Sequence, residues 1–123
     1  MSKNEGFKVS RRDDGNLTIV YPHGFLDAHT APDFETELQK AIEGGRVHII
    51  VNCKDLSYIS SAGLGVFMAY IEDVRKNKGD IKLSNMSTKV YNVFDLLGFP
   101  LLYEITPDEQ DAYNKFGNAL TRK

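Results

Sequence analysis

The chain has 123 residues, of which 41% are hydrophobic and 26% are charged, and its formal net charge at pH 7 is −2. This length suits one domain with a single core, and mixed acids and bases with little net charge exclude the basic stripe that nucleic-acid binding requires. No segment stays apolar for the ~20 residues of a membrane span, and no apolar segment follows the charged N-terminus, so we expect one cytoplasmic domain over residues 1–123 without direct nucleic-acid binding.

The first half of the chain predicts a hairpin, a helix and a strand. Two strand-like runs flank DDGN at 13–16, whose residue types suit a tight turn. Thr30 is the expected N-cap of a helix that ends before Gly44. The segment VHIIVNC at 47–53 is β-branched and almost continuously apolar, which is typical of a strand covered on both faces. The helix is predicted by apolar residues at spacings of three and four: Phe34, Leu38, Ala41 and Ile42.

A second helix is predicted from Ser61 to the cationic turn RKNK at 75–78, and a strand follows at 81–85. The helix should place one apolar face in the core, and Cys53 should be a small buried residue. Asp55 and Ser57 are expected to shape the turn before this helix. The expected core residues of the helix are Leu64, Phe67, Met68, Ile71 and Val74.

The last third predicts a third helix, a strand and a fourth helix. Ser87 is the expected cap of the third helix, and LLYEI at 101–105 is the expected strand. Thr106 and Glu109 have the spacing of a capping box around Pro107, so the fourth helix should begin there. The order predicts an α/β fold: a mixed, mostly parallel sheet of about five strands with about four helices, preceded by an N-terminal β-hairpin.

The stretch YISSAGLGVF at 58–67 places two hydroxyls at a predicted helix start. Either serine can cap the helix by accepting a backbone N–H, which is the structural interpretation. A hydrolase nucleophile would need a G-x-S-x-G elbow, and a nucleotide loop would need G-x-x-x-x-G-K-[ST]; neither is present. The lone cysteine and the scattered histidines do not form a familiar zinc pattern, so we expect no metal and no cofactor.

Three blocks resemble the STAS-domain anti-sigma factor antagonists, the bacterial partner-switching family. They are GFLDAHTA at 24–31, VHIIVNCKDLSYISSAGLGVF at 47–67 and LSNMSTKVYNVFDLLGF at 83–99, of which the middle one is the most specific. The resemblance implies a single STAS domain and a regulatory binding protein, not an enzyme. In that family the unphosphorylated antagonist binds an anti-sigma factor serine kinase and releases the sigma factor. Phosphorylation of one serine ends the binding, and a PP2C-type phosphatase restores it.

The same resemblance places the phosphoacceptor on Ser61. Ser60 stands where the family commonly has an aspartate, which leaves it as a competing acceptor, and Ala62 stands where a second hydroxyl is common. Asp27 corresponds to an acid near the acceptor surface, although a turn residue before a helix is an equally good interpretation. The expected partner-binding surface comprises Asp27, Ser60, Ala62 and Gly63.

Two other interpretations stay open. The chain could be a STAS module that is never phosphorylated and serves as a scaffold or ligand sensor in a signalling assembly, or a small nucleotide-binding α/β protein, which the absent phosphate loop disfavours. The sequence does not identify the kinase, the sigma factor, the upstream signal or the oligomeric state.

Overall fold

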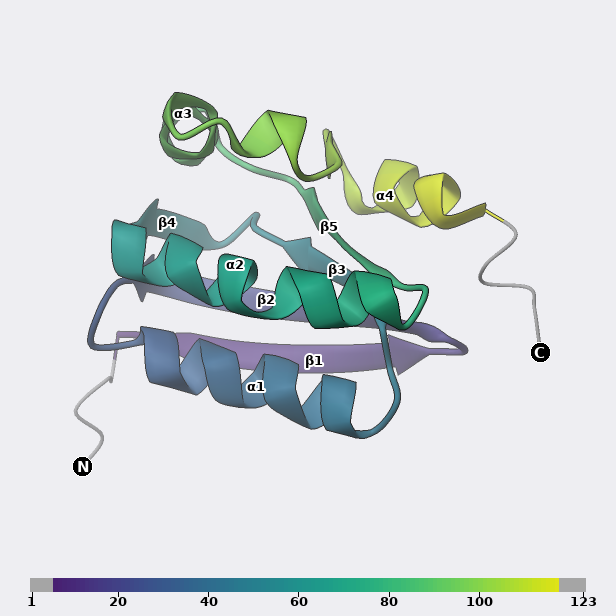
Figure 1. The fold of residues 1–123 in the computed structure, drawn as a ribbon. Coiled ribbons are helices and arrows are strands. Elements are labelled where there is room, and N and C mark those ends of the chain that lie inside the picture. Colours follow the sequence, from purple (N-terminus) through teal and green to yellow (C-terminus); the bar gives the residue numbers. More distant parts are fainter. Residues whose placement is uncertain (1–5, 118–123) are drawn as a thin grey trace.

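The described chain begins with the antiparallel hairpin that the sequence predicts. The structure is a computed structural model and describes residues 6–117. Strand β1 (Lys8–Asp14) pairs with β2 (Leu17–Leu26) along its whole length. Gly15 turns the chain between them with φ of 59°, a left-handed conformation that glycine adopts without steric cost. The hairpin therefore forms one side of the sheet (Figure 1).

Parallel strands extend the sheet from the other side of β2. They are β3 (His48–Asn52), β5 (Asp80–Ser84) and β6 (Ile105–Thr106), in the order β1-β2-β3-β5-β6. Each pairs in parallel with its neighbour. The mixed, mostly parallel α/β sheet with an N-terminal hairpin is thus confirmed. The last strand is shorter and later than predicted, because the region before it forms a 3₁₀ turn, η1 (Phe99–Leu101).

A short strand that the sequence analysis missed lies beside the C-terminal part of β2. β4 (Leu56–Ile59) pairs in parallel with Gly24–Leu26, so Ser57 lies in a strand and not in the predicted turn. Only its first and last residues are buried. Such a pattern shows neither alternation nor a continuous apolar run, the two signals of a strand. With β4, the described residues form a six-stranded sheet.

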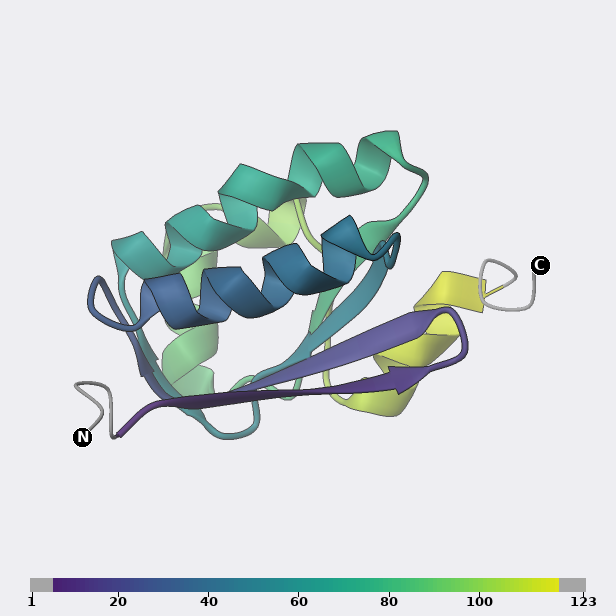
Figure 2. The same cartoon turned by 90° about the horizontal axis from the view of Figure 1, so that it is seen from below.

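Helices α1 (Ala31–Glu43) and α2 (Ser61–Lys76) lie side by side over one face of the sheet (Figure 2). Their aromatic side chains meet in the main core, where the ring centroids of Phe34 and Phe67 are 5.2 Å apart. α3 (Thr88–Leu96) adds Phe94 to the same core, 5.8 Å from the Phe67 ring. Close, tilted aromatic pairs of this kind contribute beyond the area they bury.

Helix α4 (Glu109–Phe116) covers the opposite face of the sheet, and its start corrects a prediction. Thr106 belongs to β6 and does not cap the helix; its hydroxyl donates to the carbonyl oxygens of Leu83 and Asp108. Asp108 is the N-cap instead and accepts a hydrogen bond from the backbone N–H of Asp111 at 2.8 Å. The predicted helix residues beyond 117 lie outside the described part of the chain.

Candidate functional site

The ends of β2 and β4 bring two distant parts of the sequence together. Leu26 and Ile59 are register partners, and the Ser60 N–H donates to the Leu26 carbonyl oxygen at 2.9 Å. The strands are parallel, so the segments that follow them leave the sheet at the same edge. Asp27 and the start of α2 therefore lie at one end of the sheet, where loops after parallel strands commonly form sites.

Asp27 fixes the loop between β2 and α1. Its Oδ1 accepts hydrogen bonds from the backbone N–H groups of His29 at 2.9 Å and Thr30 at 3.2 Å. Thr30 occupies the N-cap position of α1, as predicted, but its side chain makes no cap hydrogen bond. Its hydroxyl instead donates to the Phe25 carbonyl oxygen at 2.7 Å and accepts from the Asp27 N–H at 2.9 Å. The turn-forming interpretation of Asp27 is thus visible in its contacts.

The two serines at the start of α2 have different surroundings. Ser61 is the first residue of the helix, and it is exposed. Ser60 occupies the N-cap position in an extended conformation, but its side chain makes no cap hydrogen bond. The Ser60 Oγ is buried without a hydrogen-bond partner among the described residues. Of the two hydroxyl groups, the one on Ser61 is therefore open to another protein.

Ala62 and Gly63 also differ in their exposure to solvent. Ala62 is exposed, whereas Gly63, in the same first turn of α2, is buried against the ends of β2 and β4. A Cβ atom at Gly63 would stand 2.9 Å from the Leu26 carbonyl oxygen and 3.0 Å from a side-chain carbon of Ile59. Only a residue without a side chain allows the helix to start so close to the strand ends. Gly63 thus positions Ser61 from below and does not form part of the exposed surface.

The exposed face of α2 continues beyond Ser61 as a small and apolar surface. Gly65 and Met68 follow at helical spacings of four and three, which place them on the same side of the helix. Met68 is 50% exposed, so its expected core position is wrong, whereas Phe67 is fully buried as predicted. The sequence pattern did not separate these neighbours, because both are apolar and only packing against α1 and α3 decides which one faces inward.

Two exposed aromatic residues precede the site on its strands. Phe25 on β2 is 58% exposed and Tyr58 on β4 is 42% exposed, and their ring centroids are 5.7 Å apart. They directly precede the buried residues Leu26 and Ile59, so they point to the other face of the sheet. The sequence analysis missed this pair because β4 was not predicted.

The electrostatics of the site follow from what the first turn of α2 contains. No acidic residue lies in that turn, so the positive end of the helix dipole is not offset there by an acidic side chain.

Cys53, the residue after β3, is fully buried as predicted, and burial raises the pKa of its thiol to about 12, which keeps it protonated at neutral pH. In residues 6–117, no cluster of three or more His, Cys, Asp or Glu side chains is arranged to hold a metal ion. Among the same residues, no helix combines the length and apolar character that crossing a membrane requires.

The sequence of this chain is similar to a known domain family and to curated proteins. The STAS domain family matches residues 8–112. The anti-sigma-B factor antagonist of Bacillus subtilis (strain 168) is 34% identical over 98 residues, which cover 80% of this chain and 89% of that protein.

Two solved structures share the fold. The anti-sigma factor antagonist from Mycobacterium paratuberculosis superposes with a TM-score of 0.82 at 18% identity, covering 99% of this chain and 100% of that one. The phosphorylated form of the Bacillus cell fate determinant SpoIIAA gives a TM-score of 0.67 at 23% identity, with 89% and 97% coverage.

Proposed function

The chain belongs to the STAS domain family and, by homology, to its anti-sigma factor antagonists, which are regulatory binding proteins and not enzymes; from this we propose a phosphorylation-controlled mechanism. While Ser61 is unmodified, the chain binds an anti-sigma factor serine kinase and thereby releases the sigma factor. Phosphorylation of Ser61 by that kinase ends the binding, and a PP2C-type phosphatase restores it. This mechanism is taken over from the family that the sequence resembles.

The observation that supports Ser61 as the acceptor is the difference between the two neighbouring hydroxyls. A kinase must take the acceptor oxygen into its own catalytic cleft, which the exposed Ser61 at the first helical position allows. The Ser60 oxygen is buried, so this side chain would have to leave its position before a kinase could reach it. The competing acceptor is therefore disfavoured by accessibility.

A phosphate on Ser61 would change the surface without changing the fold. It adds roughly −1.5 to −2 charges and three acceptor oxygens at one point. The start of α2 tolerates this charge because its first turn has no acidic residue and Ser60 provides no side-chain cap. Against an apolar or anionic partner surface the new charge must lose its hydration, and each ~1.4 kcal/mol of that cost weakens binding about tenfold.

The proposed partner-binding surface surrounds Ser61. Ala62 is exposed beside it, while Ser60 and Gly63 shape the surface from beneath, and Asp27 holds the adjacent loop. The exposed side of Met68 extends the surface along α2. A partner that covers this region meets mostly small and apolar groups, for which a new phosphate is a strong disturbance.

The test is phosphate transfer from ATP by the kinase that co-purifies with the chain. Wild type and Ser60→Ala should each incorporate one phosphate, and Ser61→Ala should incorporate none. Circular dichroism of the three proteins should be identical, because neither serine side chain makes a hydrogen bond that holds α2. Transfer that survives Ser61→Ala would exclude Ser61 as the main acceptor.

A second measurement separates this proposal from a STAS scaffold that is never phosphorylated. The chain isolated from its own cells should lose the mass of one phosphate when it is treated with a PP2C-type phosphatase. An unchanged mass under every growth condition tested, together with no transfer in the kinase assay, would favour the scaffold.

A further inference from the structure

An exposed apolar surface lies on α3 and η1, in a different part of the fold from Ser61. Leu96 is 84% exposed and Leu101 is 91% exposed, which is unusual for side chains that gain free energy when buried. We call the whole set the α3–η1 surface. It comprises the exposed residues Tyr91, Leu96, Leu97, Leu101 and Leu102.

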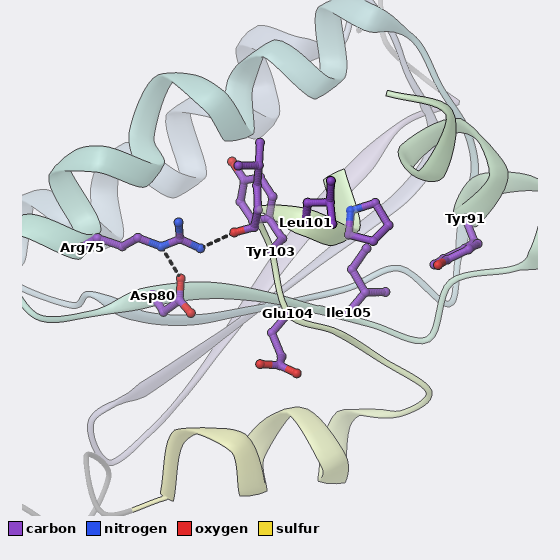
Figure 3. Close-up of a pocket in the computed structure, with 9 residues that line it drawn as sticks. Arg75, Asp80, Tyr91, Leu101, Tyr103, Glu104 and Ile105 are labelled. Atoms are coloured by element: carbon purple, nitrogen blue, oxygen red, sulfur yellow. Dashed lines mark hydrogen bonds and ion pairs between the residues drawn. The ribbon is translucent and has the colours of Figure 1, made fainter. Parts of the chain in front are cut away.

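A groove adjoins the hollow that Leu101 lines, because the two share Tyr91 and Ile105. It has a volume of about 340 Å³ and is lined mainly by apolar side chains: Met86, Thr88, Tyr91, Ile105, Thr106 and Pro107. Tyr91 and Ile105 also line a second hollow, to which Leu101 and Leu102 contribute. Figure 3 shows Leu101 and Ile105 between Arg75 at one end and Tyr91 at the other. A protruding side chain and a groove that can receive one are thus next to each other on one face.

The backbone that carries these leucines is held firmly. Phe99 and Tyr103 are buried on either side of Leu101 and stack with ring centroids 5.1 Å apart. Arg75 lies over the Tyr103 ring, donates to the Leu102 carbonyl oxygen, and forms an ion pair with Asp80 at 2.9 Å. The exposed leucines therefore need little ordering when they bind a partner, which lowers the entropic cost of association.

We propose that the α3–η1 surface is the interface of a symmetric dimer of this chain. A two-fold axis between Leu101 and the groove places Leu101 of each copy in the groove of the other. In such an interface the same surface must be complementary to itself, and a protruding group beside a matching hollow meets that condition. The dimer does not depend on the proposed role of Ser61.

The size of the surface agrees with a second copy as its occupant. From their exposed fractions, these side chains present on the order of 500 Å² of apolar area, which is within the ~300–600 Å² of the largest patch on a monomer, a patch that is often functional. A stable interface covers roughly 800 Å² on each partner, and about 65% of a homodimer interface is apolar. The α3–η1 surface therefore supplies the apolar part of a homodimer interface of ordinary size.

The charges around the surface are compatible with the approach of an identical copy. The nearby exposed charged groups have both signs, Lys89 and Arg75 against Asp95 and Glu104. Two such surfaces do not repel each other as two like-charged faces would. A strongly acidic or basic partner would find no complementary field here.

The test is sedimentation velocity of the full chain over roughly 5 to 500 µM, a range that brackets micromolar association. Wild type should shift from monomer to dimer within it. Leu101→Glu should raise the dimer dissociation constant at least about a hundredfold, because an anchor residue at an interface centre is replaced by a charge. Thr88→Phe, which fills the groove, should weaken the dimer as well.

Two controls make the outcome decisive. Tyr113→Ser removes an exposed aromatic side chain from α4, outside the α3–η1 surface, and should leave dimerisation unchanged. Ser61→Ala should also dimerise like wild type, so failure of the proposed function would leave this result intact. A wild type that stays monomeric across the range, or a Leu101→Glu protein that dimerises normally, would overturn the proposal.

Discussion

The starts of α2 and α4 are held in place in two different ways. At α4 the restraint is polar: Asp108 caps the helix, and the Glu109 carboxylate accepts hydrogen bonds from Asn52 at 2.9 Å, Tyr21 at 3.0 Å and Arg12 at 2.8 Å. At α2 the restraint is close packing, because Gly63 lets the first turn sit against the ends of β2 and β4.

The difference shows how a helix start can be fixed and still leave its polar end open. The hydrogen-bonding groups at α4 are occupied by the fold, and they hold the helix on the sheet. The start of α2 has no side-chain cap and no acid in its first turn, so its outer side is open to a new negative charge. Glycine packing therefore fixes this helix start without using its outer polar groups, which is what the proposed phosphorylation of Ser61 requires.

The largest expected effect tests the packing at α2. Gly63→Ala should lower the free energy of unfolding by about 3 kcal/mol, because the new methyl group overlaps the Leu26 carbonyl oxygen. Gly65→Ala is the matched control: nothing lies within 4 Å of its Cβ position, so it should raise stability by about 0.5 to 1 kcal/mol. Urea denaturation followed by circular dichroism measures both. Equal effects of the two substitutions would show that packing does not hold this helix start.

The next effect tests the polar restraint at α4. Glu109→Ala should cost about 2 kcal/mol, because it removes the acceptor of the buried Asn52 amide. Gln110→Ala changes the neighbouring residue, whose exposed side chain donates to Asn114 within the helix, and should stay within about 0.5 kcal/mol of wild type. The same urea titration applies. A Glu109→Ala protein as stable as Gln110→Ala would show that the hydrogen bonds to Glu109 do not hold the start of α4.

The caps of the two helices should differ by a smaller amount. Asp108→Ala should destabilise the chain by about 1 kcal/mol through loss of the cap hydrogen bond. Ser60→Ala should cost nothing or stabilise slightly, because it removes a buried oxygen that has no partner among the described residues. Thermal unfolding of the two variants and wild type measures the difference. A cost for Ser60→Ala as large as that for Asp108→Ala would mean that Ser60 caps α2 in solution.

The smallest expected effect tests whether the start of α2 accepts negative charge. Ser61→Asp should raise stability by about 0.5 kcal/mol at low ionic strength, because a carboxylate at the first helical position offsets the dipole. Ser61→Lys should lower stability by a similar amount. Both effects should shrink as salt is added, because salt screens exposed charges. A Ser61→Asp protein less stable than wild type, or a Ser61→Lys protein more stable than wild type, would contradict the electrostatic argument.

Much of the fold could be predicted from local patterns. The helix that starts at Thr88 was anticipated correctly, and Ser87 caps it by accepting the Val90 N–H at 3.2 Å. The hairpin and the central strands were also predicted, because period and turn chemistry are properties of short segments. The start of α4 was predicted two residues too early. The Thr106 hydroxyl donates a hydrogen bond to the Leu83 carbonyl oxygen on the neighbouring strand. No local sequence pattern contains this contact.

The candidate site was predicted only in part. The resemblance pointed to Ser61, Ser60 and Asp27, and the pairing of Leu26 with Ile59 brings these residues to one end of the sheet. The exposure of Met68 was not foreseen, because the face that a helix buries depends on its neighbours.

By itself the sequence determined the alternation of strands and helices and the place where a small-residue helix start carries two hydroxyls. The tertiary structure decided which hydroxyl faces the solvent, that β4 exists, and that leucines on α3 and η1 are left uncovered. The reason is physical: backbone propensity and periodicity act over a few neighbouring residues, whereas burial is set by segments far apart in the chain that pack together.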